Sequence, residues 1–316
     1  MSAKKTKVFI DGKEGTTGLR ITRRLGGRQD LELLSVPEER RKDLEERRRL
    51  INTSDITILC LPDAAARESV SLVENQAVRI IDASTAHRTQ DGWSYGFPEL
   101  SPAHRQAIRT GNRIAVPGCH ASGFIALAYP LTTAGLVAAD YPFVAYSVTG
   151  YSGGGKKMIA EYEAPDRSPD LSSPRQYGLS QSHKHLPEMQ KIPGLALAPV
   201  FSPIVADFYS GMAVTVPLFS HLMKKKVEPE QLWEIFARHY AGQQLVTVAP
   251  FGTPEDGFLP AGRLAGKDTM EIIVAGNRER LLLAARFDNL GKGASGAAVQ
   301  CLNIMTGKEE TEGLNR

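Results

Sequence analysis

Cysteine is scarce in this chain of 316 residues, which contains only Cys60, Cys119 and Cys301. Three cysteines cannot form a disulfide framework in a protein of this length, and the odd number indicates reduced thiols in a cytosolic setting. A strong excess of one charge is also lacking, because 38 basic and 35 acidic side chains leave a net charge of +3. We therefore expect no nucleic-acid partner, since phosphate backbones are bound by a large basic excess.

Long hydrophobic runs are missing as well. The first apolar run ends at Asp11 and is too short for a signal peptide. Residues 121–139 carry no charge, but they include Ser, Thr, Gly and Pro, so we expect a buried helix and no membrane contact. A hydrophobic content of 42% with 23% charged residues is typical of a folded globular protein, and the length suits about two domains.

Short apolar runs alternate with helical patterns from residue 7 to residue 116. The runs predict strands buried on both faces of a parallel sheet, and the alternation predicts a doubly wound α/β domain. The expected strands are 8–10, 31–36, 56–61, 78–81 and 113–116, with helices at 17–25, 38–50 and 64–74.

A different pattern begins after residue 118 and predicts a mixed, mainly antiparallel sheet. A stripe of small residues within 289–306 predicts a tail helix that packs closely on another element. Residues 164–203 are rich in Pro, Ser and Gly and are expected to be long loops. The other expected elements are strands at 143–149, 208–217, 270–275 and 281–287 and a helix at 229–240.

A glycine-rich loop follows the first strand and opens a helix. It reads Gly12-Lys13-Glu14-Gly15-Thr16-Thr17-Gly18, the context that a dinucleotide fingerprint requires. The glycines let the backbone approach a pyrophosphate at the helix N-terminus, so Gly12, Gly15, Thr16, Thr17 and Gly18 are candidate cofactor contacts. A glycine-rich turn without a ligand is the alternative interpretation.

The end of the second strand favours NADP over NAD. The strand ends Ser35-Val36-Pro37, without the acidic residue that would bind the ribose of NAD. Arg40, Arg41 and Lys42 follow, and they can meet the 2′-phosphate of NADP. Alternatively, the charged run is only the solvated face of a helix.

Cys119 lies where the last strand of the first pattern meets the uncharged helix. The positive end of a helix favours the thiolate, so Cys119 is the candidate nucleophile. Cys60 lies within a strand and Cys301 within the small-residue stripe, and both fit a buried, inert role. A structural role for Cys119 is the alternative.

The segment His183-Lys184-His185-Leu186-Pro187-Glu188 supplies candidate acid–base groups. Either imidazole can deprotonate Cys119 and later protonate a leaving alkoxide, with Glu188 orienting it. The His-x-His pair could bind a metal, but the sequence shows no clear cluster that would supply a third ligand, so we expect no metal. A purely structural histidine pair is the alternative.

Two further segments suggest anion binding. Arg88 follows a parallel strand, at the edge where doubly wound folds bind ligands, and its guanidinium matches a phosphate with two donors. The turn that contains Ser152, Gly153 and Lys156 offers backbone amides and a cation. Each segment can equally be a flexible turn.

As an ordered set, these motifs resemble those of the N-acetyl-γ-glutamyl-phosphate reductase family. The compact length and the Lys13-Glu14-Gly15 form of the first loop resemble the shorter of the family's two types. The resemblance runs almost end to end and rests on residues 12–18, 59–63, 82–85, 116–119, 183–188 and 291–300.

The resemblance implies an NADPH-dependent reduction of N-acetyl-γ-glutamyl phosphate to the semialdehyde, with phosphate release through a Cys119 thioester, in arginine biosynthesis. It implies a Rossmann-like NADP-binding domain of residues 1–118 with 289–316, to which the C-terminal helix returns. Residues 119–288 then form an α+β domain for catalysis, substrate and oligomerisation. A cytoplasmic homodimer or homotetramer is expected. Further cofactor contacts are implied at Ser35, Pro62, Ser84, Asn289 and Gly293.

Other functions stay open at this point. A sister reductase acting on aspartate semialdehyde or on aminoadipyl phosphate would use the same residues. A thiol hydrolase would leave the glycine loop unexplained, and a non-catalytic dinucleotide-binding regulator would leave Cys119 and the histidines unexplained. The run Ser84-Thr85-Ala86-His87-Arg88 shares only its arginine securely with the family, which leaves the roles of its neighbours open.

Overall fold

The computed structural model describes residues 4–41, 43–252 and 256–316. The chain forms two compact units, one of Met1–Pro117 with Ala294–Leu314 and one of Gly118–Gly293 with Asn315–Arg316. These units differ by a few residues from the division proposed from the sequence, whose functional domains stay a prediction.

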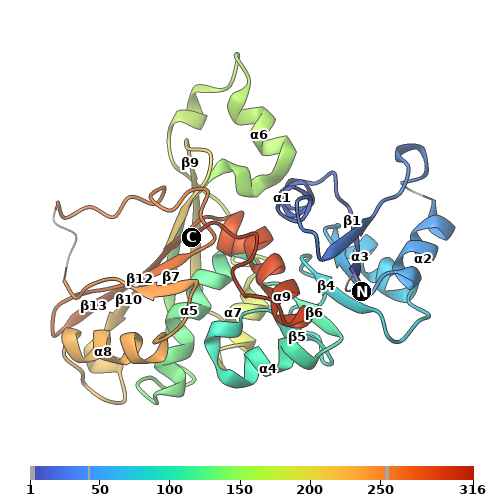
Figure 1. Ribbon diagram of the computed structural model, residues 1–316. Helices are drawn as coiled ribbons and strands as arrows, with labels where there is room; N and C mark the ends of the chain where they lie inside the picture. The colour runs from blue at the N-terminus through green and yellow to red at the C-terminus, as the bar shows by residue number, and fades with distance from the viewer. Residues whose placement is uncertain (1–3, 42, 253–255) are drawn as a thin grey trace. The chain divides into compact units, whose positions relative to one another are not determined.

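The first unit is built on a six-stranded parallel sheet with strand order β2-β1-β3-β4-β6-β5 (Figure 1). The predicted doubly wound parallel sheet is confirmed. Its strands are β1 (Thr6–Asp11), β2 (Leu31–Leu34), β3 (Ile56–Leu59), β4 (Arg79–Asp82), β5 (Ser94–Tyr95) and β6 (Arg113–Ala115). Its helices are α1 (Thr16–Leu25), α2 (Leu44–Thr53), α3 (Asp63–Ser71), α4 (Pro102–Thr110) and α9 (Gly296–Thr306).

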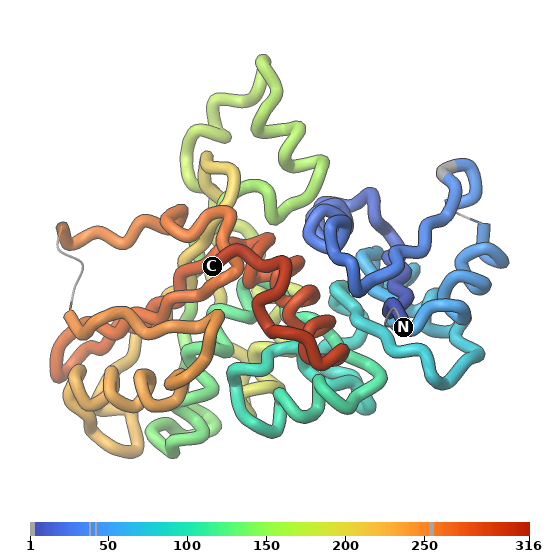
Figure 2. Tube along the Cα trace, in the orientation of Figure 1, coloured from blue at the N-terminus to red at the C-terminus, as the bar shows by residue number. Residues whose placement is uncertain are grey.

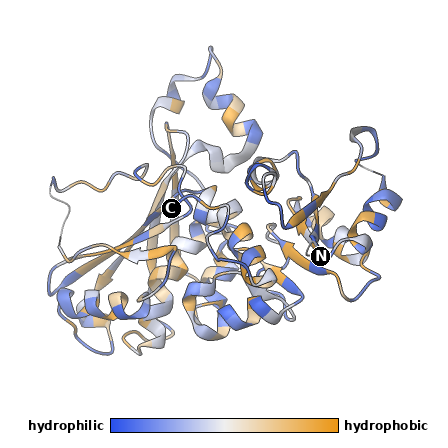
Figure 3. Cartoon of the chain, in the orientation of Figure 1, coloured by the Kyte–Doolittle hydropathy of each residue, from blue (hydrophilic) through white to orange (hydrophobic). Residues whose placement is uncertain are grey.

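Both faces of this sheet are buried, which explains why its strands are short and almost wholly apolar. Val8 and Ile10 pack in one cluster with residues of α1 and α9, whereas Phe9 packs in a second cluster with residues of α2 and α3. Figure 3 shows the hydrophobic colour concentrated along the strands and mixed with hydrophilic colour along helices such as α4.

The tail helix α9 packs within the first unit, as the small-residue stripe and the resemblance predicted. It contacts α4 and α1, and its residues Ala297 and Ala298 are buried. Gly96 approaches it so closely that a side chain there would come within 3.1 Å of Cys301 Sγ. One π-helical turn, Gly291–Ser295, precedes α9, and Figure 2 shows the tail as the red end of the trace.

The prediction of one helix over 38–50 is wrong. The segment begins with a 3₁₀ helix, Glu38–Arg40, and α2 starts only at Leu44. Asp43 causes the restart, because its carboxylate caps α2 by accepting from the backbone N–H groups of Glu45 and Glu46. Lys42 lies outside the described residues.

The second unit contains a seven-stranded sheet of order β11-β12-β13-β10-β7-β9-β8. It is mixed and mainly antiparallel, as predicted, with β11–β12 and β7–β9 parallel. Its strands are β7 (Val144–Gly150), β8 (Arg175–Gln176), β9 (Val200–Ala206), β10 (Met212–Phe219), β11 (Val246–Val248), β12 (Met270–Gly276) and β13 (Arg280–Phe287). Its helices are α5 (Cys119–Thr133), α6 (Gly155–Glu163), α7 (Leu186–Lys191) and α8 (Pro229–His239).

Helix α5 is buried along its length against β10 and β13. Gly123 makes this contact possible, because a Cβ there would lie 2.5 Å from a methyl group of Val214. Side chains that alternate with those facing α5 leave an exposed apolar strip on the opposite face of the sheet. The strip consists of Val144, Tyr146, Val200, Phe219 and Leu282.

Two predictions for the second unit are wrong. Residues 164–203 are not only loops, because they include β8, α7 and the start of β9. The strand expected at 208–217 begins only at Met212, since residues before it form a turn that ends at Gly211 with φ +110°. That backbone conformation favours glycine and ends the turn.

Candidate functional site

The glycine loop of the first unit leaves its backbone open to a ligand. Gly12 has φ +85°, and a Cβ there would lie 2.4 Å from the carbonyl oxygen of Cys60. A Cβ at Gly18 would lie 2.5 Å from the carbonyl oxygen of Gly12. Side chains are therefore excluded at both positions, and the loop can approach a phosphate at the N-terminus of α1.

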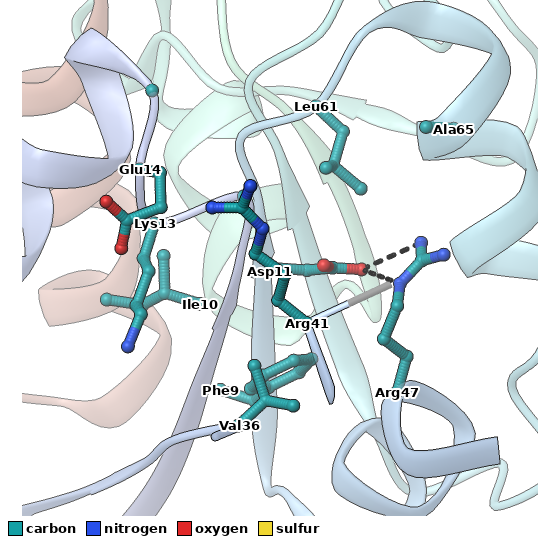
Figure 4. A pocket seen from close by; sticks show the side chains of 12 residues that line it. Phe9, Ile10, Asp11, Lys13, Glu14, Val36, Arg41, Arg47, Leu61 and Ala65 are labelled. Atoms are coloured by element: carbon teal, nitrogen blue, oxygen red, sulfur yellow. Dashed lines mark hydrogen bonds and ion pairs between the residues drawn. The ribbon is translucent and has the colours of Figure 1, made fainter. Parts of the chain in front are cut away.

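A pocket of about 460 Å³ lies at this loop, next to the carboxyl ends of β1 and β3 (Figure 4). The strand order reverses between β1 and β3, and such a switch point is where open α/β sheets bind ligands. The pocket is lined by Phe9, Ile10, Asp11, Gly12, Lys13, Glu14, Gly15, Val36, Arg41, Arg47, Leu61 and Ala65.

The wall of this pocket contains an ion pair that was not predicted from the sequence. Arg47 Nη2 of α2 lies 3.1 Å from Asp11 Oδ2, and both side chains are buried. Ser69 donates to the same carboxylate oxygen at 2.8 Å, and Arg47 also pairs with Glu68. An acidic residue directly after the first strand was the available signal.

The structure separates the two arginines proposed for the 2′-phosphate. Arg40 pairs with Asp43 at 2.8 Å and with Glu46 at 3.4 Å, so acidic side chains already neutralise it. Arg41 instead lines the pocket, as Figure 4 shows. Ser35 is exposed, and its neighbour Val36 lines the pocket.

The remaining cofactor candidates of the first unit lie around the same loops. Thr16 and Thr17 open α1, and exposed Pro62 directly precedes α3, following pocket residue Leu61. Ser84 is buried, and its hydroxyl donates to Asp82 Oδ2 at 2.7 Å. The Ser84 hydroxyl thus makes a hydrogen bond within the turn that follows β4.

Arg88 is buried and braces the backbone near the end of β6. Its Nε donates to the carbonyl of Val116 at 2.9 Å and its Nη2 to that of Ala83 at 3.3 Å. At least part of its donor capacity therefore holds the chain that leads to residue 117. Its role toward phosphate stays a prediction.

Cys119 is the first residue of α5, the position at which a helix offers its positive end. The preceding Gly118 N–H donates to Glu188 Oε2 at 3.2 Å, so α7 is tied to the turn that presents the thiol. Gly293 also lies against Cys119, because a Cβ at Gly293 would be 3.0 Å from Cys119 Cβ. The cysteine is half-buried.

His183 and His185 lie together, with ring centroids 4.7 Å apart. The His185 backbone N–H donates to His183 Nδ1 at 3.2 Å, which places the proton of neutral His183 on Nε2. Glu188 lies in the short helix α7. The hydrogen bond that Glu188 accepts from the Gly118 N–H gives it a structural task beyond the proposed orientation of a histidine.

A third histidine, His120, has two hydrogen-bond partners that the sequence analysis missed. His120 Nδ1 lies 2.7 Å from Ser147 Oγ, and its Nε2 lies 2.7 Å from the Tyr177 hydroxyl. The ring of His120 is 5.6 Å from those of both His183 and His185. A histidine directly after the nucleophile in a buried helix was the signal.

Asn289 and Ser152, proposed for different ligands, contact each other. Asn289 Nδ2 donates to Ser152 Oγ at 3.1 Å, and Ser152 is fully buried. A Cβ at Gly153 would lie 2.9 Å from the same amide nitrogen. Lys156 is exposed near the start of α6.

The other two cysteines occupy inert environments. Burial, followed by the charges of Asp82 and Asp11, raises the pKa of Cys60 to about 12. Cys301 is buried, with Sγ 3.5 Å from the carbonyl oxygen of Gly96. Neither environment favours a thiolate.

The described residues include neither a metal-binding cluster nor a membrane-spanning helix. In that part of the chain, no group of three or more His, Cys, Asp or Glu side chains is arranged to hold a metal ion. Within the same residues, no helix combines the length and the apolar character needed to cross a membrane.

Comparison with protein families matches both parts of the chain. Residues 7–108 match "Semialdehyde dehydrogenase, NAD binding domain", and residues 119–289 match "Semialdehyde dehydrogenase, dimerisation domain".

Individual relatives match over nearly full length. N-acetyl-gamma-glutamyl-phosphate reductase 2 of Nostoc sp. is 46% identical, covering 98% of this chain and 99% of the relative. N-acetyl-gamma-glutamyl-phosphate reductase of Chelativorans sp. is 49% identical, covering 95% and 97%.

A solved structure has the same fold at low identity. Aspartate semialdehyde dehydrogenase II from Vibrio cholerae, complexed with ASA, superposes with a TM-score of 0.73 at 17% identity, covering 96% of this chain and 99% of that one. At this identity the similarity shows the fold alone.

Proposed function

The chain belongs to the N-acetyl-γ-glutamyl-phosphate reductases of the semialdehyde dehydrogenase family, and on that premise we propose that it reduces N-acetyl-γ-glutamyl phosphate with NADPH. The products are N-acetyl-glutamate semialdehyde and phosphate, a step of arginine biosynthesis. The observation that carries this proposal is the placement of Cys119 at the N-terminus of α5, directly before His120, whose ring lies 5.6 Å from those of His183 and His185. Relatives that this chain matches over nearly their full length support its assignment to the shorter family type.

The pocket of the first unit fits a dinucleotide. Gly12 and Gly18 leave a cradle that a Cβ would fill, and the N-terminus of α1 follows it. Arg41 would meet the 2′-phosphate, which favours NADP(H) over NAD(H). Bound there, the cofactor supplies the hydride.

Cys119 attacks the acyl carbon of the substrate and expels phosphate, which leaves a thioester on its sulfur. The positive end of α5 favours the attacking thiolate, and the backbone N–H groups of the first turn can hold the developing oxyanion. Addition of one hydride, which a bound cofactor would supply, and of one proton reduces the thioester to a thiohemiacetal, whose collapse releases the semialdehyde and restores the thiolate. A cysteine suits both steps because a thiolate attacks and leaves readily.

His183 or His185 transfers the protons of this cycle. Both lie in the cluster around His120, and His183 holds its proton on Nε2, where it can be donated. Arg88 is proposed for the phosphate of the substrate, together with the turn of Ser152, Gly153 and Lys156. The Glu188 carboxylate keeps the Gly118 turn in place.

A homo-oligomer, either a dimer or a tetramer, is proposed for the second unit. The matched family model describes a dimerisation domain, and the exposed apolar strip on its sheet is a surface that a second copy can cover. Three reduced thiols and an NADPH-linked reaction suit the cytoplasm.

The reverse reaction tests the proposal. Given N-acetyl-glutamate semialdehyde and NADP⁺, the protein should form NADPH only with phosphate or arsenate present, because the thioester needs an oxyanion acceptor. Cys119→Ser should abolish this turnover, whereas Cys60→Ser should retain it. Rapid NADPH formation without phosphate would contradict the mechanism. Turnover of aspartate semialdehyde instead would reassign the substrate to the sister reductases.

A further inference from the structure

A directed chain of hydrogen bonds runs beside Cys119. Ser147 of β7, His120 of α5 and Tyr177, which follows β8, are joined by two contacts of 2.7 Å. All three residues belong to the second unit. The mechanism proposed above assigns no role to any of these three residues.

The direction of the first bond follows from burial. Ser147 is fully buried, and the described residues offer its hydroxyl one hydrogen-bond partner, His120 Nδ1. A buried hydroxyl hydrogen without an acceptor costs free energy. Ser147 therefore donates, and His120 Nδ1 accepts.

The direction of the second bond follows from the protonation state of His120, which is neutral. His120 is 3% exposed, and burial, followed by the charges of His183 and Lys184, lowers its pKa to about 3. A neutral imidazole carries a single N–H. Because Nδ1 accepts, Nε2 carries the hydrogen and donates to the Tyr177 oxygen.

The phenol hydrogen of Tyr177 must then point away from His120. Burial, followed by the charge of Cys119, raises the pKa of Tyr177, so the phenol keeps this hydrogen at neutral pH. The hydroxyl is thus a donor held 2.7 Å from His120 Nε2, and His120 is the residue that follows Cys119 in α5. Further titratable groups near His120 or the turn before Cys119 include His183, Lys184, His185 and Glu188.

We propose that Tyr177 donates a hydrogen bond to the negative charge that forms at Cys119, and that His120 and Ser147 are positioning residues that fix the direction of this bond. The charge is first that of the thiolate and then that of the oxygen in the tetrahedral intermediate. The second of these rests on the proposed function, whereas the thiolate needs no substrate. The two parts can therefore be tested separately.

The first test measures alkylation of Cys119 by iodoacetamide against pH in the full-length protein. Tyr177→Phe removes the donor, so the midpoint of the rate profile should rise by about one pH unit. Tyr141→Phe is the matched control, since its buried hydroxyl accepts from the Phe219 N–H at 2.9 Å, away from this chain of bonds. Its profile should coincide with that of the unmodified protein.

The second test separates positioning from packing. Ser147→Ala removes the bond that fixes His120, so it should raise the midpoint in the same direction, although Ser147 is fully buried. His120→Gln retains an amide nitrogen near the position of Nε2 and should preserve most of the profile. His120→Asn is too short to reach Tyr177 and should behave as Tyr177→Phe does.

The outcomes divide clearly. The inference is overturned if Tyr177→Phe or Ser147→Ala leaves the profile unchanged, or if Tyr141→Phe shifts it equally. If the profiles shift as expected while the protein fails to turn over N-acetyl-glutamate semialdehyde, the chain of bonds stands and the proposed function fails. If the semialdehyde is turned over, Tyr177→Phe should lower kcat about tenfold or more, because the oxyanion loses a donor.

Discussion

Asp11 and Arg47 meet in the wall of the dinucleotide pocket, although 36 residues separate them in the sequence. Asp11 ends β1 and Arg47 lies in α2, so the ion pair joins the helix to the strand. It places a buried pair of opposite charges in the wall of the pocket.

Breaking this pair should destabilise the protein. Arg47→Met leaves the Asp11 carboxylate buried without its cation, and the free energy of unfolding should fall by about 3 kcal/mol. Urea denaturation measures the loss. The double variant Asp11→Leu/Arg47→Met should recover much of it, because no buried charge is left unpaired and Glu68, the other partner of Arg47, is exposed to solvent. An unchanged midpoint for Arg47→Met would show that the pair contributes little.

Arg41 and Arg40 should differ in their effect on cofactor use. Arg41→Ala removes a guanidinium from the pocket, so the KM for NADPH should rise about tenfold, while that for NADH should stay the same. Arg40→Ala serves as the matched control, because Asp43 and Glu46 already neutralise Arg40. Steady-state kinetics decide the point, and equal effects of both variants would contradict it.

Iodoacetamide should distinguish the three thiols. At pH 8, Cys119 should react more than about a hundredfold faster than Cys60, whose raised pKa keeps it protonated. Cys301 should be protected by burial. Peptide mapping by mass spectrometry measures each rate, with Cys119→Ser as the control. Comparable labelling of all three would argue against an activated Cys119.

His120 should make the protein sensitive to acid. Its pKa is lowered in the folded state. Between about pH 6.5 and pH 3 the unfolded chain therefore binds a proton that the folded protein does not, and the free energy of unfolding decreases as the pH is lowered. From pH 7 to pH 5 this group should remove about 2 kcal/mol from the free energy of unfolding. Urea titrations of His120→Gln should lack that component. An identical pH dependence in both proteins would refute the prediction.

The apolar strip on the second sheet should hold the oligomer together. Val200→Glu places a charge within it and should weaken association by about thirtyfold, as measured by sedimentation velocity. Leu179→Glu is the control, because Leu179 is also apolar and is more exposed than Val200 but lies outside the strip. If the two variants sediment alike, the interface lies elsewhere.

The sequence predicted the elements whose signals are local. Apolar runs gave the parallel strands, and the alanines of 294–298 indicated the close packing of α9. The restart of α2 at Leu44 also had a local signal, since Asp43 followed by Glu46 is typical of a helix cap. Strand β9 was not predicted because it contains Pro203, and a proline argues against an interior strand.

The site contacts that the sequence did not predict join distant residues. Ser147 reaches His120 only because the register of β7 turns that side chain toward α5, and Tyr177 arrives from a loop after β8. Asp11 and Arg47 depend in the same way on how α2 packs beside β1. Such contacts follow from tertiary packing and cannot be read from spacing along the chain.

The split of the first unit between the two ends of the chain has a consequence for its synthesis. Ile58, Ile81 and Ile114 belong to the cluster that α9 completes with Val299 and Leu302. At ribosomal rates of about 5–20 residues per second, roughly 10 to 40 s pass between the emergence of residue 117 and that of α9. During that interval one face of the nascent sheet lacks its cover, whereas the second unit is almost continuous and can fold first. Newly made chains should therefore be clients for chaperones until the last helix leaves the ribosome.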